Sequence, residues 1–263
     1  MRNIIKADLY RIFQSKGVYI TLAIFLVLIY TPFGTITIEE SDPDAPQITV
    51  EETDSVLRFP TGREAPREFA GTSDNVVYFM LPFICSVIAA DFSSGAIKNH
   101  LAGGVSRRRY FAAKLLILAG ICTTLFFTRL VVATLVSTAV MGFDGSFDRE
   151  FLLETAGIYL PQFLLCLAFV YLGAFIIFAF RKTSTLNALY LCTALLPGTF
   201  LLIFSLISDR FKPLFYADLI FNINTFAVGG APPNLPRSLI VAVTYIIACI
   251  WGGYAIFKKA EIK

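Results

Sequence analysis

The stretch FAAKLLILAGICTTLFFTRLVVATLVSTAVM, residues 111–141, decides the fold of this chain. Its only charged side chains are Lys114, near its start, and Arg129. Because a helix that crosses the hydrocarbon core of a bilayer needs about 20 mostly apolar residues, this stretch is long enough to span it. We therefore predict a transmembrane helix here, with its first residues extending beyond the membrane.

The rest of the sequence repeats this pattern. Of its 263 residues, 56% are hydrophobic and 16% are charged, and its mean hydropathy is +0.70. Soluble domains are about half apolar and a quarter charged. Five further apolar runs occupy residues 17–38, 75–90, 156–180, 185–207 and 237–257. The sequence thus predicts an all-α membrane protein whose residues 1–263 form one transmembrane domain of six spans.

The residues that most metal and catalytic sites need are scarce. The five cysteines lie in apolar runs without Cys-x-x-Cys spacing, and His100 is the only histidine, so neither a disulfide framework nor a metal site is predicted. No phosphate-binding Gly-x-x-x-x-Gly-Lys-Ser/Thr loop occurs, and no carboxylate pair lies within the spans. We expect no catalytic residues and no cofactor in this chain, which is not predicted to be an enzyme by itself.

The charges between the spans indicate the orientation. With both termini inside, the cytoplasmic segments hold fourteen cations against three acids, whereas the external segments hold seven cations against sixteen acids. This Lys/Arg bias predicts a multi-pass plasma-membrane protein with both termini cytoplasmic. The run at 17–38 is predicted to be a span and not a cleaved signal peptide, because it is long and no small-residue cleavage site follows it.

Residues 2–16 read as an amphipathic helix. Its apolar face carries Ile5, Leu9, Ile12 and Phe13. Its opposite face carries Asp8, Arg11, Gln14 and Ser15. Such a helix lies in the inner membrane interface; the alternative is a frayed basic tail that only sets the orientation.

Two external segments differ in composition. Residues 39–74 are rich in acids and prolines, which predicts an external loop with little regular structure, either simply solvated or a receptor for substrate. Residues 208–236 combine aromatic residues with prolines. We expect them to form short re-entrant or interfacial helices that cap the outer end between spans five and six, where their apolar side chains are buried.

The connection between the second and third spans is a compact polar segment. Residues 93–102 can form a short helix closed by Gly103 and Gly104, and Ser106 can cap the next helix. The first turn of that helix then carries Arg107, Arg108 and Arg109. Cations there are disfavoured by the helix dipole, so anionic lipid headgroups or a docked cytoplasmic partner must favour them.

The same segment carries a resemblance to a known family. Asp91 ends the second span and is followed by Ser94-Gly95-Ala96-Ile97-Lys98-Asn99, by Gly104-Val105-Ser106-Arg107-Arg108, and by Tyr110-Phe111 and Lys114. This pattern resembles the ATP-binding-cassette (ABC) type-2 transporter permeases, in which an acid, a Gly-Thr-Ile-Lys-like turn, Ser-Arg and an aromatic-x-x-Lys sequence occur in this order. The chain departs from it in having Asp91 where Glu is commoner and Ala96 where Thr is commoner.

The resemblance implies that residues 91–110 form a cytoplasmic coupling segment that docks on a separate ATPase. The residues it assigns to coupling are Asp91, Gly95, Lys98, Asn99, Ser106 and Arg107. It further implies a bacterial plasma membrane, two ABC ATP-binding subunits that bind the ATP and Mg, and a second permease copy or homologue. Membrane lipids are the other expected partner, and nucleic acid is not. The expected function is export of a hydrophobic or amphipathic peptide, drug or lipid-like substrate; the alternative is a non-transporting scaffold or immunity-type protein of the same fold.

Arg129 is the one charge placed within a span. It lies about 21 Å along the helix from Leu115, past the middle of a core about 30 Å thick, where an Arg costs about 2.5 to 3.5 kcal/mol at most. Its side chain can extend to the outer headgroups, face a hydrated cavity in a transport pathway, or bind carbonyls and hydroxyls such as those of Thr128 or Thr134. The sequence leaves these three possibilities open.

Overall fold

A computed structural model describes residues 2–29, 60–207, 216–225 and 235–259. Within these ranges the long elements are all helices, and no strand occurs. In chain order they are α1 (Arg2–Gln14), α2 (Lys16–Leu28), α3 (Ala65–Ala70), α4 (Asn75–Ile84), the π-helical turn η1 (Cys85–Ala89), α5 (Ala90–Ser93), α6 (Ala96–Ala102), α7 (Arg107–Met141), α8 (Arg149–Phe180), α9 (Thr183–Ile207), α10 (Leu219–Thr225) and α11 (Leu235–Lys259).

Five segments of the described chain are long and apolar enough to cross a membrane. They are Asn75–Ser93, Arg107–Met141, Arg149–Phe180, Thr183–Leu201 and Leu235–Lys259. A sixth is present if α1 and α2, which meet at a bend of 70°, are counted as one broken span. The predicted all-helical membrane fold is therefore confirmed. Residues 30–38 of the predicted span 17–38 and residues 39–59 of the predicted loop 39–74 lie outside the described residues.

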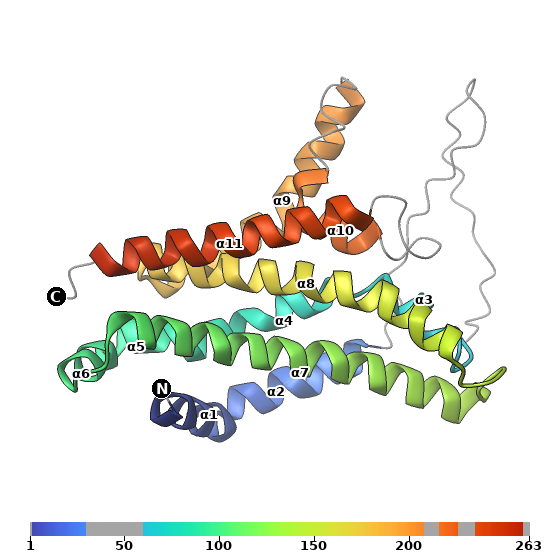
Figure 1. Cartoon of the computed structure of the whole chain (residues 1–263), viewed down its shortest axis with the longest axis horizontal. Coiled ribbons are helices and arrows are strands. Elements are labelled where there is room, and N and C mark those ends of the chain that lie inside the picture. The colour runs from blue at the N-terminus through green and yellow to red at the C-terminus, as the bar shows by residue number, and fades with distance from the viewer. Residues whose placement is uncertain (1, 30–59, 208–215, 226–234, 260–263) are drawn as a thin grey trace.

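The long helices α7, α8 and α11 run side by side, and α8 packs against both α7 and α11 (Figure 1). The helix α9 leaves the bundle at a steep angle (Figure 1). At one end of the bundle lie α1, α6 and the C-terminal end of α11, and at the other lie α3, α10 and the connection between α7 and α8 (Figure 1). The segments predicted to be cytoplasmic are thus at one end and those predicted to be external at the other.

Local sequence sets where several helices begin. Ser106 accepts a hydrogen bond from the backbone N–H of Arg109 at 3.3 Å, which confirms the predicted cap of α7. Asp148 caps α8 in the same way through the N–H of Phe151 at 2.9 Å. Gly95 has a φ of +70°, a conformation that L side chains rarely adopt, and it separates α5 from α6. The predicted helix at 93–102 therefore begins only after Gly95.

The prediction of little regular structure at 39–74 is wrong for its last part. Residues 60–74 form α3 and two turns, and α3 packs on α7 and α8. The backbone N–H of Ser73 donates to the carbonyl of Ala70, and that of Asn75 donates to the carbonyl of Thr72. These turns connect α3 directly to α4. Helices this short form because of tertiary contacts and not because of their own propensity.

The helix α1 is present, but the prediction that Asp8 lies on the face opposite Ile12 is wrong. Asp8 is buried on the face that it shares with Ile4 and Ile12, and this face packs toward α7 and η1. Leu9 and Phe13, predicted on the same apolar face as Ile12, are exposed. The helix thus has a buried face with a charge at its centre and a separate exposed apolar face.

Candidate functional site

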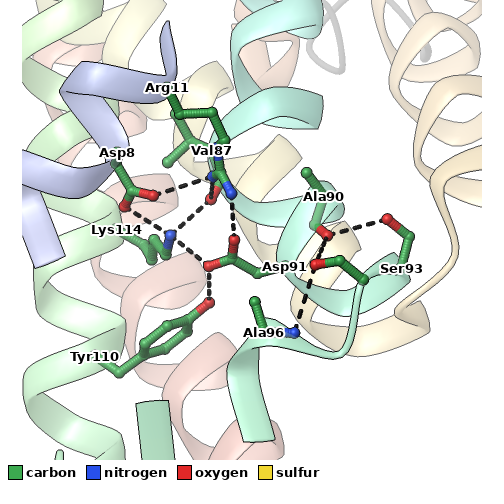
Figure 2. A network of polar contacts seen from close by, with 10 residues as sticks. Asp8, Arg11, Val87, Ala90, Asp91, Ser93, Ala96, Tyr110 and Lys114 are labelled. Carbon is green, nitrogen blue, oxygen red and sulfur yellow. Dashed lines mark hydrogen bonds and ion pairs between the residues drawn. The ribbon is translucent and has the colours of Figure 1, made fainter. Parts of the chain in front are cut away.

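A buried ion network joins α1, α5 and α7 (Figure 2). The Lys114 ammonium on α7 is completely buried and lies 2.6 Å from a carboxylate oxygen of Asp8 and 2.6 Å from one of Asp91. Arg11 bridges the same two carboxylates, at 3.0 Å from Asp8 and 2.7 Å from Asp91. Two carboxylates thus face two cations, so the network is electrically balanced and three helices distant in sequence are tied at one point.

A π-helical turn supplies an additional acceptor to this network. The carbonyl of Val87, within η1, accepts hydrogen bonds from Lys114 at 2.8 Å and from Arg11 at 3.2 Å. A π turn departs from the regular i→i−4 pattern of the α-helix, and such turns frequently occur at functional sites. Pro82 precedes the turn inside α4 and cannot donate a backbone hydrogen bond. The irregular second span therefore allows its backbone to bind the two cations.

Tyr110 links the network to the segment predicted to couple with a partner. Its hydroxyl donates to Asp91 at 2.7 Å, and its ring lies 5.2 Å from the Lys114 ammonium. The carboxylate of Asp91 thus binds Arg11, Tyr110 and Lys114, and 1% of the residue is exposed. Asp91 and Tyr110 flank α6 in the sequence, so both ends of the connection that carries α6 are anchored in the network.

The residues assigned to coupling divide into buried and exposed ones. Asp91 is in the network, and Gly95 forms the turn that leads into α6. On α6, Lys98 and Asn99 are exposed whereas Ile97 is buried. The anchored ends and the exposed polar surface of α6 are compatible with docking of a partner on this helix.

Arg107 has a contact that the sequence did not predict. Its guanidinium donates to the carbonyl of Phe257 at 3.1 Å and to that of Lys258 at 2.8 Å. These carbonyls belong to the last turn of α11, where helical acceptors have no partner within the helix. Arg107 therefore ties the start of α7 to the end of α11, in addition to any role at a partner surface.

Arg129 is buried at the opposite end of the bundle, with 1% exposed. It donates to the hydroxyl of Ser73 at 2.8 Å, to the hydroxyl of Thr72 and to the carbonyl of Phe69. Of the three possibilities left open by the sequence, this arrangement corresponds to binding of carbonyls and hydroxyls. The partners lie at the end of α3 and in the turn after it, in place of Thr128 or Thr134. The assignment of Arg129 to a transport pathway stays a prediction.

Further polar contacts continue from Arg129 across the predicted outer end. The fully buried Gln162 of α8 accepts from Ser73 at 3.1 Å and donates to the carbonyls of Ala70 and Ile223, each at 3.0 Å. In α10, Asn222 accepts from Ser238 of α11 at 2.9 Å. We call these contacts the outer network; it joins α3, α7, α8, α10 and α11 at the predicted outer end.

Asp8, Arg11 and Gln162 were missed as site residues from the sequence. Asp8 is four residues from both Ile4 and Ile12, so its position on a buried helix face was a detectable signal. Lys114, quoted only as part of the family pattern, is a single cation within an apolar run. No group of three or more His, Cys, Asp or Glu that could hold a metal occurs among the described residues.

The family described as "Protein of unknown function (DUF2705)" matches residues 67–263. The chain belongs to this family. The matched region runs from α3 to the C-terminus, and so includes Asp91, Tyr110 and Lys114 but not Asp8 and Arg11. No curated protein matches the chain.

Proposed function

We propose that this chain is the permease subunit of an ATP-driven ABC exporter, which moves a hydrophobic or amphipathic substrate outward. Its partners in this proposal are two copies of an ABC ATP-binding subunit and a second permease copy or homologue. The ATPase subunits bind the ATP and Mg. The complex lies in a bacterial plasma membrane with both termini of this chain in the cytoplasm and with membrane lipids around it.

The observation that carries the proposal is the position of α6 between two anchors. Asp91 before α6 and Lys114 after it are buried and ion-paired with each other and with α1. Breaking a buried ion pair on one side costs about 3 to 5 kcal/mol, so a force on α6 moves α1 and α7 more easily than it separates them. A partner that binds α6 thus has a rigid connection to the membrane helices.

The exposed side of α6 supports the same proposal. Lys98 and Asn99 are free to contact a cytoplasmic protein because they are exposed, whereas the buried Ile97 holds the helix on the bundle. Lys98 is a better probe of docking than Arg107, because a change at Arg107 also removes two hydrogen bonds to the end of α11.

The test is to look for an ABC ATPase gene beside this one and to reconstitute this chain in lipid with that ATPase. We expect the two to co-purify, a transported substrate to stimulate ATP hydrolysis, and Lys98→Glu to abolish the stimulation in a folded, inserted protein. Lys182→Glu is the matched control, because Lys182 is also exposed and lies in the connection of α8 and α9. Normal stimulation with Lys98→Glu would exclude Lys98 from the docking surface. The lack of any ATPase partner would favour a non-transporting scaffold or immunity-type protein.

A further inference from the structure

A pocket lies where α9 diverges from α8, α10 and α11. Its volume is about 220 Å³, and Leu172 of α8 with Pro197 and Leu201 of α9 contribute apolar walls. Asp218, immediately before α10, and Tyr245 of α11 line the same pocket. The pocket is thus a mainly apolar space with a carboxylate on its wall. Figure 1 shows the direction in which α9 leaves the bundle.

The charge of Asp218 is not neutralised by a cation in the described part of the chain. Its carboxylate accepts the backbone N–H of Phe221 at 3.0 Å, which caps α10 but leaves the negative charge in place. Arg237 stacks on the ring of Tyr216, with its guanidinium carbon 4.1 Å from the ring centroid, and makes no ion pair with Asp218. Burial raises the pKa of Asp218, so the charged carboxylate is disfavoured there until a cation approaches it.

The other polar groups of the pocket are also acceptors. The Tyr245 hydroxyl donates its proton to the carbonyl of Ala217 at 3.3 Å, which leaves its lone pairs for a ligand. Pro197 lies inside α9 and has no N–H, so it cannot donate to the carbonyl of Thr193 one helical turn earlier. Thr193 also lines the pocket. An anionic ligand would meet like charge here, whereas a cation would meet a carboxylate and neutral acceptors.

We propose that this pocket binds the cationic group of a lipophilic amine, with Asp218 as its counter-ion and the apolar walls around its hydrocarbon part. The volume is below the roughly 300 to 1,000 Å³ of typical ligand pockets, so it admits one aromatic or short aliphatic group with its ammonium. The role of such an amine as the exported substrate, or as part of it, rests on the proposed function. Binding of the amine to the pocket does not depend on that function.

The binding experiment uses the purified full chain in nanodiscs without any ATPase. Binding of 4-fluorobenzylammonium and of its neutral analogue 4-fluorobenzyl alcohol is followed by fluorine NMR and corrected with empty nanodiscs. We expect wild type to bind the ammonium at least about tenfold more tightly than the alcohol, as a partly buried ion pair requires. Asp218→Asn keeps a good capping residue but loses the charge, and we expect it to bind both probes equally.

Two further variants make the test specific. Asp148→Asn changes the other capping aspartate, which is outside the pocket, and we expect it to keep the tenfold preference. Gly198→Leu keeps Asp218 but fills space beside it, since a Cβ at Gly198 would lie 3.8 Å from the Asp218 carboxylate, and we expect weaker binding of both probes. The proposal is overturned if wild type does not prefer the ammonium, or if Asp218→Asn retains the preference. A pocket that only holds an apolar lipid chain would show no preference for the ammonium.

The same probe separates this proposal from the transport proposal. If the ammonium binds through Asp218 but does not alter ATP hydrolysis in the reconstituted complex, the pocket stands and its role in transport fails. If hydrolysis responds to other substrates while no charge-dependent binding is found, transport stands and the pocket proposal fails.

Discussion

Replacement of Lys114 by Met tests whether the ion network of Asp8, Arg11, Asp91 and Lys114 holds α1, α5 and α7 together. The change leaves Asp8 and Asp91 buried with Arg11 as their only cation, and the Arg11 side chain is 37% exposed. Removing one partner of a buried ion pair costs about 3 to 5 kcal/mol, so we expect Lys114→Met to lower the free energy of unfolding by that amount. Lys182→Met, at an exposed site, is expected to change it by about 0.5 kcal/mol or less.

A double variant distinguishes loss of charge balance from loss of packing. Lys114→Met combined with Asp8→Asn leaves one carboxylate, Asp91, paired with one cation, Arg11. We expect the double variant to be more stable than the sum of the single effects indicates, by about 1 to 3 kcal/mol. The measurement is SDS-induced unfolding in mixed micelles. Strict additivity, or a cost for Lys114→Met close to that of Lys182→Met, would refute the role assigned to the network.

Three further predictions concern the orientation, the outer network and a helix cap. Reporter fusions are expected to place both termini and residues 91–110 in the cytoplasm; either terminus outside would overturn the orientation. Arg129→Leu is expected to cost about 2 kcal/mol or more because it leaves buried acceptors without a donor, with Arg129→Lys retaining part of the stability, and equal thermal stability of the two would contradict this. The pKa of Asp148 is lowered, chiefly by the N–H of Phe151, so its contribution to stability is present above the ordinary value of 3.8 and is lost as pH falls through the lowered pKa. Thermal unfolding between about pH 2 and 7 should therefore have a weaker acid dependence in Asp148→Asn than in wild type, and identical profiles would exclude this role.

The long helices were predictable because membrane spans depend on length and composition. The apolar run at 111–141 lies within α7, and the cap by Ser106 was also readable, since capping is local chemistry. The helices α7 and α8 begin before the predicted spans because helices extend through the interface into water, where no apolar run indicates them. Their start points depend on polar caps, at Ser106 and Asp148.

The two polar networks were not predictable in the same way. Lys114 and Asp8 are 106 positions apart, and nothing in either local pattern indicates that the two helices meet. The short helix α3 forms because Arg129 and Gln162 bind carbonyls in its last turn, which is tertiary structure and not propensity. What the sequence did contain was a set of isolated polar residues on apolar faces, and in this fold those residues pair with one another.

The most direct measurement of the central claim is cross-linking from α6 to the ATPase. Single cysteines are placed at Lys98 and, as control, at Lys182, in a chain whose five native cysteines are replaced, and each is treated with a short thiol-to-amine cross-linker in the reconstituted complex. We expect a cysteine at position 98 to be cross-linked to the ATPase subunit and one at position 182 not to be. An intact complex with no cross-link from position 98, or with equal cross-linking from both positions, would contradict docking of the ATPase on α6.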